Sequence, residues 1–394
     1  MKVLYISSFC PISEYEAMFK KYNSASSHAA HKFNRLVIRG LKANGCSVDA
    51  LTQRIIPKGI KDAYPRKKIT EDGVDFNILP RKKNITFNRA YTIVRAFFDI
   101  LKWRKQNPDG VIICDIILGE MSIATVLARA FTKIKTVGLV TDVPAVKAGD
   151  TRSGIKAIPM KIKNGIIQSY DAYLFLTEQM DSLLNPKHKP YTVVEGVADE
   201  NVCNIPNTLE NKHPEKVCMM AGLLERVFSI ETLLEAFQNV KCDDARLRFY
   251  GKGGAVPFIL KASEADSRIQ YCGELTNAQI VEEEKKATFL VNPRRSDGEW
   301  TAYCFPSKNM EYVASGTPLV GCKLPCIPPE YEGHFYEIYP ETVQGFTDTL
   351  QKLLDTDREE IHAFGLAAQK WTLENKTPTP SLKKTVEMLK ELRG

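Results

Sequence analysis

The sequence predicts an α/β protein with two domains, each a parallel sheet wound with helices on both faces. Short β-branched and aromatic runs alternate with longer amphipathic stretches, as they do in repeated βαβ units. The alternation stops at a polar passage, residues 200–216, and then restarts. With 394 residues, 44% of them hydrophobic, the chain is long enough for two full cores. These observations predict two Rossmann-like domains in tandem.

The first domain is expected to span residues 1–199. Its strand-like runs lie at 2–8, 46–52, 74–80, 110–116, 134–142 and 172–177. A helix is expected at 29–45, with Gly45 just past its end and an apolar face formed by Phe33, Leu36, Val37, Gly40 and Leu41. The basic run 65–68, PRKK, is interpreted as a solvated surface stretch.

The second domain is expected to span residues 217–373, after a linker at 200–216. Its strands lie at 217–222, 245–253, 268–273, 287–293 and 317–322, and its helices at about 229–239, 277–286 and 308–315. A proline-bounded break and a short amphipathic helix follow in the segment 374–394.

Composition indicates a cytoplasmic protein. The ten cysteines lie singly, without a Cys-x-x-Cys pair, and are typical of small core side chains in a reducing compartment. The first residues carry too short an apolar run for a signal peptide, and no stretch reaches the roughly 18 apolar residues of a spanning helix.

Charge is distributed unevenly. The first 190 residues carry 31 Lys and Arg against 16 Asp and Glu, a net charge of +15, whereas the remaining 204 carry 23 against 31, a net charge of −8. The basic half indicates an anionic partner: nucleic acid, a membrane surface or a phosphorylated substrate. No recognition motif supports nucleic acid, so we expect none to bind.

One segment of the basic half, residues 88–105, admits two interpretations. Its aromatic side chains are interleaved with Arg95, Lys102, Arg104 and Lys105, as in a helix at a membrane interface. A helix packed on its own sheet would show the same apolar stripe of Val94, Phe97, Phe98 and Leu101. We favour packing on the sheet and add peripheral contact with an anionic membrane through the basic rim.

The sequence of residues 305–318 predicts a helix whose first turns bind a ligand. Ser307 is the expected N-cap and Gly316 the residue that ends the helix. Glu311 lies one position too late for a capping box, so its carboxylate is available to accept hydrogen bonds from the hydroxyls of a ribose. The amides of residues 307–309, with Lys308, favour a diphosphate. A solvated surface glutamate is the alternative interpretation.

Other ligand signatures are missing from the sequence. No Gly-x-Gly-x-x-Gly follows the first strand, and no P-loop is present, which argues against a dinucleotide enzyme and an ordinary ATPase. The Asp-x-Asp at 355–357 fits a helix cap at Asp357. We therefore expect no catalytic metal and no cofactor.

Residues 305–331, FPSKNMEYVASGTPLVGCKLPCIPPEY, resemble the nucleotide-sugar segment of retaining glycosyltransferases of family four. These enzymes have the GT-B fold of two facing Rossmann-like domains, with a last helix that crosses back to the first domain. The members that the chain looks closest to build bacterial exopolysaccharide, capsule or lipopolysaccharide. The likeness continues, in the family's order, at 137–144, 174–180, 193–199, 219–237, 246–254, 268–275 and 289–300.

The resemblance implies a set of donor residues. Glu311 would bind the ribose, and the family's other acid falls on Tyr303. The expected cations around the diphosphate are Arg226, Arg294, Arg295 and Lys308, next to Gly222 and Ser307. Tyr271, Cys272 and Gly273 would flank the base.

The resemblance also assigns residues to the first domain, which would bind the acceptor. Asp142, at the end of a strand, matches a position that faces the transferred sugar, although an Asp after a strand is more often a cap. We expect Asp142, Arg294 and Lys308 to be catalytic. The small side chains of residues 23–30 permit close approach of a ligand, and Ser26, Ser27 and His28 are the expected acceptor-side residues.

The expected reaction is metal-independent transfer of a hexosyl-type sugar, with retention, from a UDP or GDP sugar to a glycan or lipid-linked acceptor. It would take place in the cytoplasm or at the inner face of the membrane. Two alternatives share the fold: a nucleotide-sugar epimerase or hydrolase, and a noncatalytic sugar-nucleotide-binding protein. Product analysis without acceptor would identify the first, whereas the second would bind nucleotide and release none.

Overall fold

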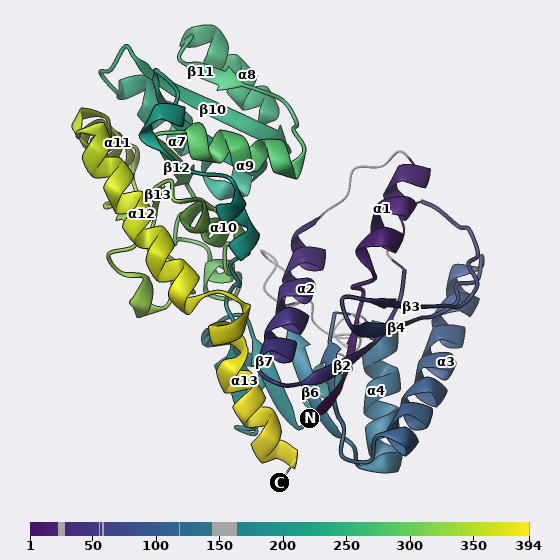
Figure 1. Cartoon of the computed structure of the whole chain (residues 1–394). Helices are drawn as coiled ribbons and strands as arrows, with labels where there is room; N and C mark the ends of the chain where they lie inside the picture. Colours follow the sequence, from purple (N-terminus) through teal and green to yellow (C-terminus); the bar gives the residue numbers. More distant parts are fainter. Residues whose placement is uncertain (23–27, 55, 57–58, 118, 144–163, 394) are drawn as a thin grey trace, which may run out of the picture. The chain divides into compact units, whose positions relative to one another are not determined.

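Figure 1 shows the computed structural model, which describes residues 1–394 except 23–27, 55, 57–58, 118, 144–163 and 394. The chain divides into two compact units, each with its own sheet and hydrophobic core. Unit 1 contains Met1–Val197 and Pro378–Gly394, and unit 2 contains Ala198–Thr377. The expectation of two α/β domains with mainly parallel sheets is confirmed.

The sheet of unit 1 has the order β3-β4-β2-β1-β5-β6-β7-β8. All neighbours pair in parallel except β3 and β4, which are antiparallel. Because the order reverses between β1 and β5, the carboxyl ends of these two strands form the switch point at which open α/β sheets bind ligands. The strands are β1 (Lys2–Ser7), β2 (Ser47–Thr52), β3 (Lys67–Glu71), β4 (Val74–Ile78), β5 (Val111–Asp115), β6 (Lys135–Val140), β7 (Ala172–Phe175) and β8 (Tyr191–Val193).

Helices cover both faces of this sheet. On one face, α2 and α13 bury Leu36 and Leu389 with strand residues such as Tyr5 and Phe76. On the opposite face lies α3, whose Trp103 donates an indole hydrogen bond of 2.7 Å to Asp49 of β2. The helices are α1 (Ile12–Lys21), α2 (His28–Ala43), α3 (Ile85–Gln106), α4 (Gly119–Thr132), α6 (Gln179–Leu184) and α13 (Pro378–Arg393).

The apolar stripe expected on residues 88–105 is wrong in part. In α3 the buried side chains are Thr92, Ala96, Ile100 and Trp103, a stripe rotated by about two residues from the expected one. Val94 and Phe98 are 52% and 56% exposed, because α3 packs chiefly against α4. Together α3 and α4 therefore present what we call the α3–α4 apolar face: Phe87, Val94 and Phe98 lie exposed along one side of α3, and Phe131 of α4 packs on Phe97 beside Phe98.

The sheet of unit 2 has the order β11-β10-β9-β12-β13-β14, and every neighbouring pair is parallel. Its switch point lies between β9 and β12. The strands are β9 (Lys216–Leu223), β10 (Ala245–Lys252), β11 (Ile269–Tyr271), β12 (Phe289–Asn292), β13 (Leu319–Gly321) and β14 (Tyr336–Glu337).

Two hydrophobic clusters lie on the two faces of this sheet. One cluster joins Met220 and Phe249 to Phe237 of α7 and Phe346 of α11. The other joins Met219 and Leu290 to side chains of α9, α10 and α12. The helices are α7 (Ile230–Asn239), α8 (Val256–Ala265), α9 (Asn277–Lys286), α10 (Ser307–Ser315), α11 (Val343–Asp355) and α12 (Arg358–Asn375).

One segment differs from its sequence-based interpretation. The passage 200–216 belongs to unit 2 and contains two 3-10 turns, Glu200–Asn204 and Leu209–Asn211. In the basic run 65–68, by contrast, Lys67 and Lys68 are exposed, as expected of a solvated surface stretch, and they begin β3, which pairs antiparallel with β4 at the sheet edge, where charged side chains are common.

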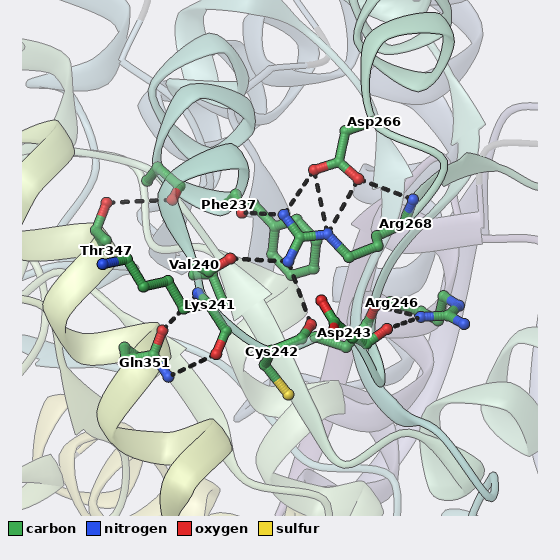
Figure 2. Close-up of polar contacts among 12 residues, drawn as sticks. Phe237, Val240, Lys241, Cys242, Asp243, Arg246, Asp266, Arg268, Thr347 and Gln351 are labelled. Carbon is green, nitrogen blue, oxygen red and sulfur yellow. Dashed lines mark hydrogen bonds and ion pairs between the residues drawn. The ribbon is translucent and has the colours of Figure 1, made fainter.

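Arg268, at the amino end of β11, ties three elements of unit 2 together (Figure 2). Its guanidinium is 2.7 Å from the carboxylate of Asp266 and donates to the carbonyls of Val240 and Cys242, just past the end of α7. It also lies over the ring of Phe237. A cation at the carboxyl end of a helix satisfies its last carbonyls, so Arg268 fixes this end of the sheet.

Candidate active site

The candidate site of unit 2 lies at the carboxyl edge of its sheet. Three glycines, Gly222, Gly251 and Gly253, lie where the paired strands β9 and β10 end. A Cβ on Gly251, whose φ is +125°, would lie 1.9 Å from the carbonyl oxygen of Gly222, and a Cβ on Gly253 would lie 2.3 Å from that of Leu224. Only glycine fits these positions, and the edge therefore exposes main chain to an approaching ligand.

Hydrogen bonds to strands β9 and β12 hold helix α10 against this edge. The hydroxyl of Tyr312 accepts from the amide of Ala221 at 2.8 Å and donates to the carbonyl of Ala221 at 3.1 Å. Asn292, the last residue of β12, donates to the side chain of Asn309 at 2.6 Å. The start of the helix is thus held at the switch point by hydrogen bonds to both central strands.

The N-cap expected at Ser307 is wrong. Pro306 is the N-cap, with φ −75° and ψ 94°, and Ser307 is the first helical residue. The helix begins one residue earlier because the carbonyl of Pro306 accepts from the amide of Asn309. Ser307 is exposed and its side chain makes no capping bond, whereas Gly316 ends the helix with φ +80°, as expected.

Lys308 and Glu311 form the charged centre of this edge. The Nζ of Lys308 lies 2.8 Å from the carboxylate of Glu311, one helical turn away, and 3.9 Å from that of Glu284 in α9. Burial lowers the pKa of Lys308, but the two carboxylates outweigh this and hold the pKa above its usual value. Lys308 is therefore charged. A Cβ on Gly222 would lie 2.9 Å from Cε of Lys308, which places the lysine against β9.

The three expected arginines have separate partners. Arg226 pairs with Glu231 at 2.9 Å and lies over the ring of Phe258. Arg295 pairs with Asp297 at 2.6 Å. Each of these arginines thus has a contact of its own, and their convergence with Lys308 on the diphosphate stays a prediction.

Arg294 is the most enclosed of these cations. It is 9% exposed, and its guanidinium lies 4.7 Å from the ring of Phe228 and 4.6 Å from that of Trp300. It donates to the carbonyl of Cys304 at 3.0 Å. Burial lowers the pKa of Arg294 from its usual value. The side chain thus links the segment after β12 to the one that precedes α10.

The residues expected around the base lie beside the glycines. Tyr271 ends β11 and donates to the carbonyl of Gly251 at 2.8 Å, and Gly251 in turn donates to the carbonyl of Gly273. Burial raises the pKa of Cys272. Tyr303 caps a 3-10 turn, Glu299–Ala302, that lies just before α10 in the chain.

The expected residues of unit 1 are only partly described. Asp142 follows β6 and is half-buried, at the carboxyl edge of the sheet. His28 begins α2, while Ser26 and Ser27 lie outside the described residues.

Sequence reasoning did not single out Asp115, which ends β5 at the switch point of unit 1. It is 6% exposed and its Oδ1 accepts from the amide of Ile117 at 3.0 Å. Burial raises its pKa to about 6. A carboxylate that directly follows four apolar strand residues was the available signal.

Among the described residues, no group of three or more His, Cys, Asp or Glu side chains is arranged to hold a metal ion. Asp357 caps α12 by accepting from the amide of Glu359, which confirms the helix-cap interpretation of the Asp-x-Asp sequence. None of the described helices is both long and apolar enough to span a bilayer.

Solved structures identify the fold. Sucrose-phosphate synthase from Thermosynechococcus elongatus is similar with a TM-score of 0.70 at 13% identity, covering 100% of this chain and 99% of that chain. An E. coli structure described as trehalose-6-phosphate from E. coli bound with UDP-2-fluoro glucose has a TM-score of 0.66 at 10% identity, with 99% of each chain covered. HepE from Anabaena, in complex with UDP, has a TM-score of 0.61 at 10% identity, covering 99% of this chain and 100% of that chain. The chain has the GT-B fold.

The sequence of unit 2 identifies the class of enzyme. Residues 215–356 match the family model described as "Glycosyl transferases group 1", and this segment contains the glycine edge and all of α10. No curated protein matches the chain. With this domain in a GT-B fold, the protein is a glycosyltransferase.

Proposed function

We propose that the protein transfers a sugar, with retention, from a UDP or GDP sugar to a glycan or lipid-linked acceptor in bacterial surface polysaccharide synthesis. The observation that carries the proposal is the charged pair of Lys308 and Glu311 on a helix start held against the glycine edge of β9 and β10. Several proteins of similar fold have been solved with UDP, among them S. aureus TarM with fondaparinux, alpha-GlcNAc-glycerol and UDP. These complexes support a nucleotide-sugar donor.

Each part of the edge has a role in this proposal. Glu311 accepts hydrogen bonds from the ribose hydroxyls, and Lys308 with the amides at the start of α10 neutralises the diphosphate. Separating a cationic sugar from a diphosphate is the costly step, so stabilising the leaving group dominates catalysis. Arg294 acts by positioning the segment before α10, since it is buried between two rings. The reaction needs no metal or cofactor, and activity should survive EDTA.

Donor binding provides the first test. UDP, GDP, ADP and their sugars can be compared in a thermal-shift panel. The ligand that binds should stabilise the protein by about 2.7 kcal/mol when it is at 100 times its dissociation constant. Glu311→Ala should abolish the shift. Glu332→Ala is the matched control, because Glu332 is an exposed carboxylate of unit 2 that pairs with Lys323. A Glu311→Ala protein that binds donor as well as the wild type would refute the ribose assignment.

Catalysis by unit 1 needs a separate test. Asp142 is assigned to the transferred sugar, so Asp142→Asn should lower kcat by about 100-fold or more while the donor thermal shift stays unchanged. Anomeric analysis of the product by NMR should show retention. Sugar released equally with and without acceptor would instead support a hydrolase or epimerase.

A noncatalytic sugar-nucleotide-binding protein is a second candidate, and Tyr303 at the position of the family's other acid favours it. Such a protein would show the donor thermal shift and release no nucleotide with any acceptor. Turnover that Tyr303→Phe leaves unchanged would remove this argument.

The α3–α4 apolar face supports peripheral contact with an anionic membrane. Two cations accompany its exposed apolar side chains: Lys82, whose Nζ lies 4.9 Å from the ring of Tyr91 beside Phe87, and Lys102, one turn after Phe98 on α3. Exposed apolar side chains among cations are typical of interfacial binding to acidic lipids. We therefore propose that the enzyme works at the inner face of the membrane.

Vesicle sedimentation tests this contact. Binding to phosphatidylcholine vesicles with 30% phosphatidylglycerol should weaken between 50 and 500 mM salt, because salt screens the attraction. The Phe98→Asp, Phe131→Asp double variant should bind at least tenfold more weakly. Leu366→Asp, at an exposed apolar side chain of α12, is the control. Absence of binding at low salt would remove the membrane contact.

A further inference from the structure

Lys212 lies at the amino edge of the sheet of unit 2, at the end opposite to the glycine edge. It follows the 3-10 turn Leu209–Asn211 and is half-buried. Its Nζ donates at 2.9 Å to the carbonyl of Ala287, shortly before β12, and at 3.1 Å to the hydroxyl of Thr317, shortly before β13. The lysine therefore holds the segment 200–216 against the first ends of two strands.

Lys285 of α9 is the first of two cations that act on Lys212. It is 3% exposed and donates to the carbonyl of Ile205, in the same segment 200–216. Burial lowers the pKa of Lys285, and the nearby Cys203 and Glu284 offset this only in part. Lys285 is thus a buried cation whose hydrogen bond goes to a neutral acceptor.

Arg358, the first residue of α12, is the second cation. Its guanidinium donates to the main-chain carbonyls of residues 213–215, at 3.0, 2.6 and 2.8 Å. In the part of the chain that the structure describes, no carboxylate forms an ion pair with Lys212, Lys285 or Arg358. The cluster therefore has an excess of positive charge in a poorly solvated place, where an anion would be stabilised.

These surroundings favour the neutral amine of Lys212. Burial, together with the charges of Lys285 and Arg358, lowers the pKa of Lys212 to about 7. A neutral amine has two N–H groups, as many as the two acceptors that Nζ contacts, and a lone pair in the remaining direction. Deprotonation therefore costs no hydrogen bond and produces a nucleophile.

His362 of α12 adds an unused donor to the cluster. It is 9% exposed, and its Nδ1 is buried and hydrogen-bonds to none of the described residues. Burial and the charge of Lys212 lower the pKa of His362, although the exposed Glu210 opposes them, so the ring is neutral and one of its nitrogens carries a proton. An anion on Lys212 would thus have two cations and an imidazole near it.

Carbon dioxide is the electrophile that suits this cluster. Acylation of the amine would leave a neutral amide, and a carbonyl compound would leave an imine, so neither would supply the missing negative charge. Reaction with carbon dioxide gives a carbamate, a small anion at the place of the ammonium group. It is also a triatomic reagent, small enough to reach a half-buried nitrogen.

We propose that Lys212 is carbamylated by carbon dioxide and that the carbamate is the anion of this cluster. The nitrogen lone pair attacks the carbon, an N–C bond forms, one C–O π pair moves onto oxygen, and an N–H proton passes to water. The remaining N–H keeps one of the two present acceptors. The site does not depend on the proposed function, because it lies at the opposite edge of the sheet from the donor.

Trapping the carbamate in the full chain tests the proposal. The protein is equilibrated with ¹³C-bicarbonate at about pH 8, where the Lys212 amine is neutral. Triethyloxonium ion then converts any carbamate into a stable ethyl ester, which is located by mass spectrometry of the peptides. Label on Lys212 should exceed label on Lys261, an exposed lysine of α8, at least tenfold.

A pair of variants tests the neighbouring charge. Arg358→Gln should lower the label on Lys212 at least threefold, because the carbamate loses a counter-charge. Arg246→Gln is the matched control, since Arg246 also donates to main-chain carbonyls, those of Asp243 and Ala245, and is not among the main influences on Lys212. It should leave the label unchanged. Circular dichroism shows that both variants are folded.

Three results would overturn the proposal. Equal label on Lys212 and Lys261 would show an ordinary surface reaction, and equal label in the two arginine variants would show that the cluster does not stabilise the carbamate. The third is absence of label on Lys212. If bicarbonate then raised the Tm of the wild type and of Lys212→Gln equally, the cluster would bind a free anion instead.

Discussion

The carboxyl edges of the two sheets present different chemical groups to a ligand: chiefly main chain in unit 2 and side chains in unit 1. In unit 2 the edge consists of main chain brought together by Gly222, Gly251 and Gly253, with the charged pair of Lys308 and Glu311 beside it. In unit 1 the edge carries charged side chains: Arg54, Arg81 and Arg89, which line a cavity of about 240 Å³, and the buried Asp115. Main-chain groups keep their positions when side chains are substituted, so the edge of unit 2 accepts a ligand of one fixed shape. The side chains at the edge of unit 1 can be changed by single substitutions without disturbing the strands.

The largest effect should come from the glycine edge. Gly251→Ala places a Cβ 1.9 Å from a main-chain oxygen, which neither strand can avoid without moving. With the added strain of φ +125°, we expect a loss of about 3 kcal/mol or more in the stability of unit 2, and no donor thermal shift. Hydrogen exchange measured by mass spectrometry should show the loss in β9 and β10.

Gly273→Ala is the control for that experiment. Gly273 also has a positive φ, +78°, but a Cβ there meets nothing within 4 Å. We expect a cost of about 1 kcal/mol from the backbone alone. Equal effects of the two substitutions would mean that close approach of the strands is not what the glycine edge provides.

The pH dependence of stability tests whether Asp115 at the edge of unit 1 is penalised by burial. Burial raises its pKa from 3.8 to about 6, so the folded state binds the proton more tightly than the unfolded state. Stability should fall as pH rises from about 4 to 6, and the penalty should persist above that range. Asp115→Asn keeps the acceptor for Ile117 and removes the charge. It should stabilise the protein by about 2–3 kcal/mol at pH 7.5 and hardly at all at pH 4.

Urea unfolding at the two pH values measures this difference. A variant with unchanged stability at pH 7.5 would show that the carboxylate is not penalised by burial. Lost transfer activity in a stabilised variant would mark Asp115 as a functional residue that is retained at a cost in stability.

Substituting Arg268 should lower the stability of unit 2 without changing donor binding at its carboxyl edge. Because it lies at the amino end of β11, Arg268→Ala should cost about 2 kcal/mol by leaving Asp266 and the carbonyls after α7 without their donor (Figure 2). The donor Kd, measured at a temperature where the variant is folded, should stay within twofold. A large rise in the donor Kd would show that the two ends of the sheet are coupled.

Much of the fold followed from the sequence because parallel strands are buried on both faces and appear as short apolar runs. β3 was missed, since an edge strand with lysines has no such run. The exposed stripe of α3 was missed for another reason. Two apolar stripes share this helix, and which of them is covered depends on α4, a distant segment of the chain.

The site was predicted less completely than the fold. The sequence was enough to place Glu311 and Lys308 in the first turns of one helix and Gly316 at its end. It did not reveal the partners of Arg226, Arg294 and Arg295, because long side chains reach rings and carboxylates from other segments. The N-cap was misplaced because Pro306 provides a suitable extended conformation one residue before the serine.

Unit 1 is discontinuous in the chain, since its last helix, α13, begins only after all of unit 2. Leu382 and Leu389 of α13 are fully buried beside α2, and Gly40 of α2 leaves room for the main chain of Pro378. During synthesis, unit 2 is therefore complete before unit 1 can close its core. Until the last helix leaves the ribosome, the side of α2 that packs against α13 remains uncovered. This exposed apolar surface is where we expect a chaperone to bind.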